Sequence, residues 1–479
     1  MILATAYICG LFNLILAAAM LIPMVADLFA ENLDWQSFLG SALIVGLPSL
    51  LLVISTRRTM PPFSLRFGFL LVNAVWFSTS IVAAVPFVLS GQGLSFADAV
   101  FEATSGITTT GSTVLSGLDS LPPGILLWRS LTQWLGGLGI IAMGLLLLPF
   151  LRVGGMQVYK MESSIQSDSP YSRFTQFSAA LLWLYLVLSV CCAVAYWATG
   201  MSVFDAINHA MSTISTGGYS THDASMGHFG PATLAVGIVF MIAGALPFVA
   251  ILRALVTGKL RDAWEIQIPV LLSILGIFTL VITLAGLFET DRESYDILIH
   301  AAFNITSVVT TTGFASTDYT LWGPFVIALF LVGTFLGGAA GSTSGGFKTY
   351  RLIILYQSLR VGLKELIYPN GVFIMRYGRT DVPGHAARSV GLFMAAFVLI
   401  LLAGTLGLAA TGLDLVTAFT GALTALTNVG PGLGELIGPA GNFSSLSDPA
   451  KWILSAAMLL GRLEILTVMV LFTPAFWRT

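Results

Sequence analysis

The chain has 479 residues, of which 56% are hydrophobic and only 9% are charged, and its formal net charge is −2 at pH 7. Its mean hydropathy of +0.90 lies well outside the range of soluble globular domains. This composition excludes a soluble protein. We therefore expect an integral membrane protein, and we expect no nucleic acid among its partners.

The first apolar segment, residues 6–29, lacks the basic region and the cleavage site of a signal peptide, so we expect a retained membrane helix. Residues 1–60 are expected to form an N-terminal pair of transmembrane helices. Later apolar runs at 181–198 and 271–288 approach the roughly 20 residues that a helix needs to cross the bilayer. The alternation typical of transmembrane strands is not visible, which predicts an all-α polytopic membrane protein.

Basic and acidic residues favour different connections between the apolar runs. Most of the 21 lysine and arginine residues fall on connections that can all lie on one side of the membrane. Since cytoplasmic loops carry the excess of basic residues, we expect these connections and both chain termini to face the cytoplasm. Acidic residues then gather on the outer side, where they would concentrate cations, although ordinary solvated loops explain part of that excess.

Four stretches share one pattern, in which a short, moderately apolar segment leads into small or hydroxylated residues and then glycine. They are residues 95–111, 202–218, 296–313 and 414–430. Each apolar segment is too short to span the bilayer, so we predict four re-entrant helices, each between two spanning helices. A glycine-capped helix end would explain one copy, but four copies favour a shared axis. The predicted units are residues 61–152, 153–262, 263–368 and 369–479.

The residue types after the re-entrant helices suit a dehydrated cation. Irregular backbone at membrane depth is tolerated only where protein buries it or where it lines a water-filled path. Backbone carbonyls from four segments would supply a ring of oxygen ligands for a monovalent cation. Glycine permits the backbone angles that aim these carbonyls, and threonine or serine adds hydroxyl acceptors without charge.

These segments, together with the stretches "GTFLGGAAGSTSGGFKTYR" and "GRLEILTVMVLFTPAFW", resemble the Trk-type (TrkH-like) membrane subunit of the Trk/Ktr/HKT superfamily of potassium transport proteins. The resemblance covers essentially the whole chain. It implies four helix, pore-helix, filter and helix units with pseudo-fourfold symmetry around one central pore, plus two extra N-terminal helices. It also implies K⁺ as the transported ion, no organic cofactor, a location in the bacterial inner membrane, a homodimer, and a cytosolic ring of TrkA-like nucleotide-binding regulatory subunits.

Carried over to this sequence, the resemblance implies a selectivity filter formed by the segments after the four pore helices. The four walls differ, because the second has glycine and the fourth has valine where the others have threonine before the final glycine. Selectivity is therefore expected to be less stringent than in a symmetric tetramer. The implied filter residues are Thr109, Thr110, Gly111, Thr216, Gly217, Gly218, Thr311, Thr312, Gly313, Asn428, Val429 and Gly430.

Residues 337–348, "GGAAGSTSGGFK", cluster glycine and serine, which break helices, so we predict an interruption of the second helix of the third unit. Broken helices at membrane depth usually line a cavity, although a small-residue face for close helix packing is the alternative. The resemblance implies an intramembrane gate below the filter. The implied gate residues are Gly337, Gly338, Gly341, Ser342, Thr343, Ser344, Gly345, Gly346, Lys348 and Arg462.

A few polar side chains stand out within apolar surroundings. Arg462 falls in the middle of a predicted span, so it should face the pore or bridge to another helix, because an unpaired guanidinium is costly there. Glu464, two residues along, would project from a different side of a helix, so we expect no direct pair between them. Arg129 is expected to anchor at the outer interface, with bracing of the filter as the alternative. His209 and His300 are expected to be structural residues and not proton relays.

Two other functions are weighed against a channel-like potassium pore. An intramembrane hydrolase is disfavoured, because the chain lacks G-x-S-x-G and H-E-x-x-H motifs and has no histidine near residues 342–345, so we expect no enzyme. A sodium- or proton-coupled symporter is the alternative, and Glu464 is the one clear membrane carboxylate that would support it. Because no nucleotide-binding motif is present, nucleotide control would come from a separate subunit that docks on basic residues such as Arg376, Arg379 and Arg388.

Overall fold

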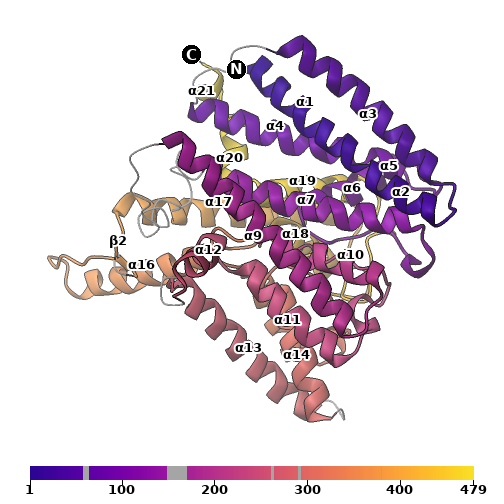
Figure 1. The fold of residues 1–479 in the computed structure, drawn as a ribbon. Coiled ribbons are helices and arrows are strands. Elements are labelled where there is room, and N and C mark those ends of the chain that lie inside the picture. Colours follow the sequence, from indigo (N-terminus) through magenta and orange to yellow (C-terminus); the bar gives the residue numbers. More distant parts are fainter. Residues whose placement is uncertain (58–63, 148–169, 260–263, 290–292, 379, 479) are drawn as a thin grey trace.

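The computed structural model describes residues 1–57, 64–147, 170–259, 264–289, 293–378 and 380–478 (Figure 1). Within these ranges almost all regular structure is helical. The described strands are β1 (Arg376–Tyr377) and β2 (Thr380–Asp381), which form one short antiparallel pair. Six helical segments in this part of the chain are long and apolar enough to cross a membrane, or up to eight if two sharply bent helix pairs each count as one span.

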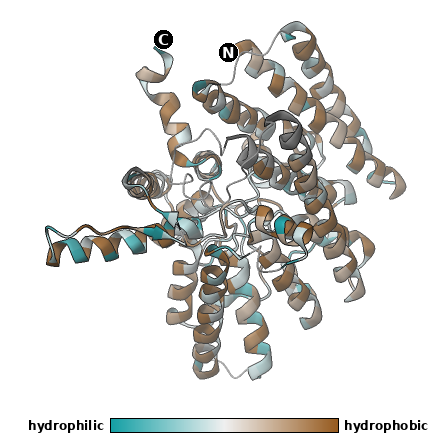
Figure 2. Ribbon diagram, turned by 60° about the vertical axis from the view of Figure 1, so that its left-hand side comes forward, coloured by the Kyte–Doolittle hydropathy of each residue, from teal (hydrophilic) through white to brown (hydrophobic). Residues whose placement is uncertain are grey.

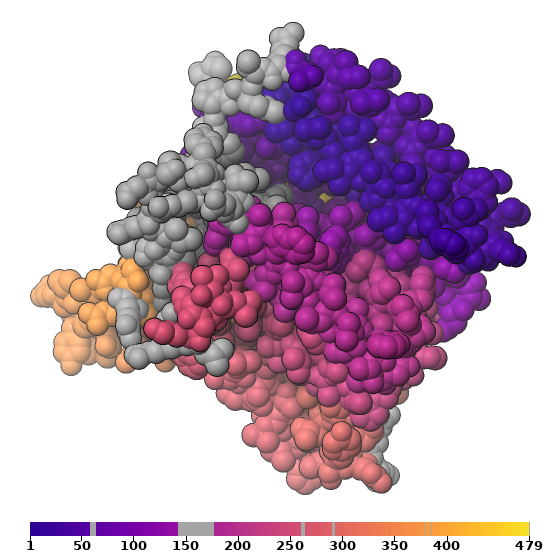
Figure 3. Space-filling model, viewed as in Figure 1, coloured from indigo at the N-terminus to yellow at the C-terminus, as the bar shows by residue number. Residues whose placement is uncertain are grey.

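The N-terminal helices form a separate layer on one side of the molecule, at the upper right of Figures 1 and 3. They are α1 (Ile2–Ala19), α2 (Leu21–Phe29) and α3 (Trp35–Thr56). α1 packs against α3 and against α4 of the next unit. Large apolar side chains such as Leu47, Leu51 and Ile54 of α3 are exposed, as expected for a helix whose outer face meets lipid. Figure 2 shows apolar residues over most of the long helices.

The rest of the chain repeats one order four times: a long helix, a short helix, and a second long helix. The first unit contains α4 (Leu65–Ala83), α5 (Val85–Leu89), α6 (Phe96–Ile107), η1 (Leu118–Ser120) and α7 (Pro123–Leu147). The second contains α9 (Pro170–Ala198), α10 (Val203–Ile214), η2 (Ser225–His228), α11 (Pro231–Ala245) and α12 (Phe248–Thr257). The third contains α13 (Gln267–Glu289), α14 (Ser294–Val309), η4 (Tyr319–Leu321), α15 (Pro324–Phe335) and α16 (Thr349–Ile367). The fourth contains α17 (Gly384–Ala409), α18 (Leu415–Thr427), α19 (Asp448–Arg462), α20 (Ile465–Met469), η5 (Val470–Phe472) and α21 (Pro474–Trp477).

The short helices α6, α10, α14 and α18 are packed in a closed circle. Each contacts the long helix before it in the chain, and each also contacts the second long helix of the preceding unit. α10 packs on α7, α14 on α11 and α18 on α15, and α6 completes the circle against α19. Since α6 and α19 are far apart in sequence, this contact brings the first and fourth units together around one axis.

Side chains fix where three of the short helices begin. Ser95, Ser202 and Asp414 each accept a hydrogen bond from the backbone N–H three residues later, which satisfies a donor that the first turn leaves free. At Ser95 the Asp98 side chain also accepts from the Ser95 N–H, completing a capping box. The sequence therefore sets the N-terminal ends of these helices locally.

Three of the second long helices are broken, and the sequence indicated only one of the breaks. α15 ends at Phe335 and α16 begins at Thr349, where the glycine and serine cluster predicts an interruption. In addition, α11 and α12 are bent by 96°, and α19 and α20 by 107°. The expectation that Arg462 lies within a continuous span is wrong: it is the last residue of α19, and Glu464 at the bend has a left-handed φ of +64°. α16 belongs to the orange segment that extends to the left in Figure 3.

Candidate ion-binding site

Each short helix ends in the same turn, and one residue at the same position in every turn is left-handed. The φ angles are +52° at Thr109, +52° at Thr216, +58° at Thr311 and +56° at Asn428. A left-handed conformation is uncommon outside glycine and is strained for a β-branched residue such as threonine. The sequence repeat is therefore accompanied by a repeat of an unusual backbone geometry.

The turn is a Schellman motif at the carboxyl end of the helix. The Thr110 N–H donates to the Ser105 carbonyl at an N···O distance of 2.8 Å, and the Thr109 N–H donates to the Gly106 carbonyl at 2.9 Å. Equivalent pairs of bonds end α10, α14 and α18. The segments are thus helix ends, but the left-handed capping residue is threonine or asparagine. The glycine comes two residues later, so capping does not explain it.

The final glycines lie in a ring where no side chain fits. A Cβ atom on three of them would lie 2.0–2.2 Å from a carbonyl oxygen of the next segment, and all four have positive φ angles between +79° and +110°. The pairs of glycine and carbonyl residue are Gly111 with Gly217, Gly218 with Thr312, and Gly313 with Val429. Gly430 closes the ring, since a Cβ added there would lie 2.8 Å from the Thr110 carbonyl oxygen. Each contact leads from one segment to the next. The four segments therefore meet around one axis.

The polar groups at this ring carry no formal charge. The threonine hydroxyls bond to one another, with Oγ1 atoms 2.7 Å apart for Thr108 and Thr110 and 2.8 Å apart for Thr310 and Thr312. Three residues that directly precede ring glycines are fully buried: Thr110, Thr312 and Val429. Their carbonyl oxygens accept no hydrogen bond from the described part of the chain. The equivalent oxygen of Gly217 accepts from Gln133 Nε2 at 2.5 Å. Buried acceptors without donors suit a cation ligand.

A hollow lies directly beside the ring. All four ring glycines line it, together with residues that follow them in the chain, such as Ser112, Tyr219 and Pro431. His222 and Asp223 line its edge, and the hydrogen bond from His222 lowers the pKa of the Asp119 carboxyl, which lies in the loop outside the membrane-spanning segments. The hollow thus joins the ring to a polar, acidic rim.

Arg129 and Glu102 form a buried ion pair behind the first two segments, with Nε and Oε1 2.8 Å apart and side chains 1% and 0% exposed. Arg129 Nη1 donates to the Ser220 carbonyl at 2.8 Å, and its guanidinium lies 4.2 Å from the centre of the Tyr219 ring. Glu102 Oε2 accepts from the Val114 N–H at 2.9 Å. The expectation that Arg129 is an interfacial anchor is wrong, because its α7 position faces the protein interior, where it joins the chain after Gly111 to the chain after Gly218.

The histidines of the short helices α10 and α14 have hydrogen-bond partners. His209 is fully buried, and its ring nitrogens lie 2.8 Å from the Asp205 carbonyl oxygen and 2.9 Å from Ser220 Oγ. His300 Nδ1 lies 2.7 Å from Ser316 Oγ, and its Nε2 lies 3.3 Å from Asp296 Oδ1. Both arrangements hold the segment that follows a ring glycine to its own pore helix.

The loop of residues 336–348 lies against the ends of three short helices. Thr343 Oγ1 donates to the Ile214 carbonyl at 2.9 Å, at the end of α10. Ser344 Oγ donates to the Thr310 carbonyl at 2.7 Å, after α14. The Gly346 N–H donates to the Thr427 carbonyl at 2.8 Å, at the end of α18. The Gly345 N–H donates to Thr311 Oγ1 at 2.7 Å, so the loop also contacts the left-handed residue of the third segment.

Two cationic side chains hold the carbonyls of this loop. Arg462 Nη2 donates to the Thr343 carbonyl at 2.6 Å, and Lys348 Nζ donates to the Ser344 carbonyl. Among the described residues, neither side chain has a carboxylate partner. Glu464 instead pairs with Arg351, whose guanidinium lies 3.6 Å from the centre of the Phe393 ring. As expected, Arg462 and Glu464 do not pair with each other; the bend between α19 and α20 separates them.

Some contacts at the site carry no signal in a single sequence. Gln133 of α7 contacts both Gly217 and the Tyr219 N–H, and Asn428 Nδ2 donates to Thr110 Oγ1 at 2.9 Å, joining the fourth segment to the first. Isolated polar residues within apolar helices have many possible partners, so only the packing of the helices identifies these contacts.

Comparison with known proteins finds relatives that match the chain over almost its whole length. The model of the TrkH family, described as a cation transport protein, matches residues 36–479. The chain is 42% identical over 470 residues to the Trk system potassium uptake protein TrkI of Halomonas elongata, covering 97% of this chain and 95% of that protein. It is 37% identical over 485 residues to TrkH of Salmonella typhimurium, covering 98% of both proteins. Its fold matches the crystal structure of the potassium transporter TrkH from Vibrio parahaemolyticus with a TM-score of 0.92, 34% identity and full coverage of both chains. The prediction of an all-α polytopic membrane protein and the resemblance to the TrkH family are confirmed.

Proposed function

Because the chain belongs to the TrkH family of cation transport proteins, we propose that it takes up K⁺ across the bacterial inner membrane through the axis of the glycine ring. The observation that carries this proposal is the ring itself, in which four glycines pack on neighbouring carbonyls and three buried carbonyl oxygens lack donors. Such oxygens can replace the water molecules around a monovalent cation. The other filter positions, Thr109, Thr216, Thr311 and Asn428, would form the adjacent carbonyl layer.

The loop of residues 337–348 would act as the gate. It is held by hydrogen bonds to three pore-helix ends and by the Arg462 and Lys348 side chains, so its closed arrangement depends on many weak bonds. A cation passing at roughly 4 Å from Arg462 would be opposed by about 4 kcal/mol at an effective dielectric constant of about 20. Opening would require the loop to leave the pore-helix ends.

A channel-like pathway is favoured over coupled symport by the state of two glutamates near the site. Glu102 pairs with Arg129, and Glu464 pairs with Arg351, so each is engaged in an ion pair and is a poor carrier for a coupling ion. Potassium flux into proteoliposomes along an imposed K⁺ gradient, with no sodium or pH gradient, separates the two mechanisms. Flux that requires a sodium or proton gradient would establish symport.

Control by a separate nucleotide-binding ring and assembly as a homodimer belong to the same proposal. Arg376 and Arg388 are exposed, as a docking surface requires, whereas Arg379 lies outside the described residues. Neutralising these three arginines together should reduce co-purification of the regulatory subunit. Unchanged co-purification would place the docking surface elsewhere.

Substitution of one ring glycine tests the filter. In Gly313→Ser the added Cβ would lie 2.0 Å from the Val429 carbonyl oxygen, so the carbonyl must move. We expect the preference for K⁺ over Na⁺ to fall, measured as relative flux of potassium, rubidium and sodium into proteoliposomes. Gly412→Ser is the matched control, because Gly412 also has a positive φ of +94° but has no atom within 4 Å of the added Cβ.

The control separates backbone strain from intrusion into the ring. Both serines adopt a left-handed conformation at similar cost, but only the one at Gly313 displaces a carbonyl. An unchanged ion preference in Gly313→Ser, in protein that folds as well as Gly412→Ser, would mean that the filter is elsewhere.

A further inference from the structure

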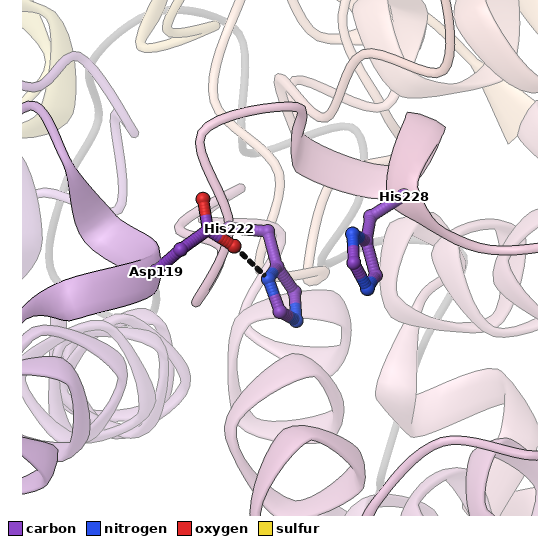
Figure 4. A group of neighbouring side chains, drawn as sticks. All are labelled: Asp119, His222 and His228. Carbon is purple, nitrogen blue, oxygen red and sulfur yellow. Dashed lines mark hydrogen bonds and ion pairs between the residues drawn. The ribbon is translucent and has the colours of Figure 1, made fainter.

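Three side chains with metal-binding chemistry lie together (Figure 4), and one of them, His222, lines the hollow beside the ring. They are Asp119 of η1, His222 of the loop after the second filter segment, and His228 of η2. One ligand atom from each lies within 4.8 Å of the other two. All three are reachable from solvent, since Asp119 and His228 are exposed and His222 is 18% exposed.

The two imidazoles are arranged face to face. Their ring centres are 3.8 Å apart with an angle of 6° between the planes, and the Asp119 side chain points at His222 Nδ1 (Figure 4). His222 Nε2 has no hydrogen-bond partner within the described residues, and it lies 3.6 Å from Asp205 Oδ1. The cluster thus combines two imidazoles, one of them with an unpartnered nitrogen, and two nearby carboxylates.

We propose that Asp119, His222 and His228 form a binding site for a divalent transition metal, with Zn²⁺ as the representative ion. Two imidazoles and one carboxylate are a common zinc ligand set, with water in the fourth position. Potassium, calcium and magnesium ions prefer oxygen ligands, so this site differs in chemistry from the glycine ring. Ligand atoms lie about 3.4 Å apart around a tetrahedral zinc ion, so the side chains must rearrange on binding. Asp119 and His222, which share a hydrogen bond, must separate, and the stacked His222 and His228 rings must turn so that one nitrogen of each faces the ion.

The location gives the metal a consequence for transport. His222 lines the same hollow as the ring glycines Gly111, Gly218 and Gly313, and it is four residues after Gly218. A bound Zn²⁺ adds two positive charges at the entrance to the cation path. This consequence rests on the proposed function, and we expect saturating Zn²⁺ to reduce K⁺ uptake by about threefold or more.

Direct binding tests the site without any transport measurement. Purified full-length protein in detergent is titrated with Zn²⁺ by isothermal calorimetry, together with His228→Gln and Asp119→Asn. We expect the native chain to bind Zn²⁺, and each variant to bind it at least about tenfold more weakly. Removing a group that only orients a metal ligand already lowers metal affinity by about tenfold or more, and removing the ligand itself should lower it at least as much. His300→Gln is the matched control: His300 also pairs with an aspartate, Asp296, but lies outside the cluster, so zinc affinity should be unchanged.

Flux measurements then test the consequence. Zinc should inhibit K⁺ uptake into proteoliposomes of the native chain, while His228→Gln should need at least about tenfold more zinc for the same inhibition. Zinc affinity that is equal in the native chain and in both ligand variants would overturn the site. Binding without inhibition would overturn the role at the entrance, and an absence of K⁺ flux before zinc is added would count against the proposed function alone.

Discussion

Removing the Arg129 guanidinium should destabilise the protein more than removing any exposed charge, because the side chain is buried behind the glycine ring. In Arg129→Met the apolar stem keeps its packing, but Glu102 is left without its cation. Glu102 is 0% exposed, so water cannot replace the lost partner. The Ser220 carbonyl also loses its donor.

The magnitude follows from the contacts. Breaking a buried ion pair by removing one partner costs about 3–5 kcal/mol, because the remaining charge stays buried. Glu102 keeps its bonds from the Val114 N–H and the Thr113 hydroxyl, so we expect the lower half of that range. Lys451→Met is the matched control. Lys451 Nζ lies 2.6 Å from Asp98 Oδ1, but Asp98 is 17% exposed and keeps its bond to the Ser95 N–H. The Lys451 side chain is itself only 5% exposed, but water can reach Asp98 in its place, so the loss of Lys451 should cost about 1–2 kcal/mol, less than the loss of Arg129.

The assay is thermal unfolding of the detergent-solubilised protein, followed by the loss of the monodisperse peak in size-exclusion chromatography. We expect Arg129→Met to lower the midpoint clearly and Lys451→Met to lower it less. The double variant Glu102→Gln with Arg129→Met should recover part of the loss, because it leaves no unpaired charge at the position of the buried pair. Equal midpoints for Arg129→Met and Lys451→Met, or no recovery in the double variant, would refute the reasoning.

Three further outcomes test the loop and the bend below the ring. Gly345→Ala places a Cβ 2.6 Å from a carbonyl oxygen of α18, and this overpacking costs about 1–3 kcal/mol. The closed loop should therefore lose population, and K⁺ flux into proteoliposomes should rise severalfold. Gly391→Ala, with open space around its Cβ, should leave the flux unchanged. Arg462→Gln removes a charge and a loop hydrogen bond, so basal flux should rise; loss of folded protein without increased flux would favour a purely structural role. Arg351→Gln should lower the unfolding midpoint, and adding Glu464→Gln should restore part of it, because the double variant leaves neither charge unpaired. A midpoint that is lower in the double variant than in Arg351→Gln would contradict the pairing.

The sequence was sufficient for those features that depend on local composition. Apolar length identifies membrane helices, and glycine and serine clusters identify the interruption between α15 and α16, because both properties act over a few neighbouring residues. The four short segments with a terminal glycine could be aligned for the same reason. The strained position within each turn was not predictable: it falls on threonine or asparagine, although glycine adopts such angles most easily.

Contacts between distant segments were decided only by the tertiary structure. The sequence placed Arg129 at the interface, since a single charge near a helix end commonly lies there, yet its partners Glu102 and Ser220 come from other elements. The bend after Arg462 and the cluster of Asp119 with two histidines likewise depend on how the units pack around the axis. The sequence by itself thus determined that four segments repeat and which residues they contain. Only the packed chain determined that these segments close into a ring, because that depends on backbone contacts between residues more than 80 positions apart.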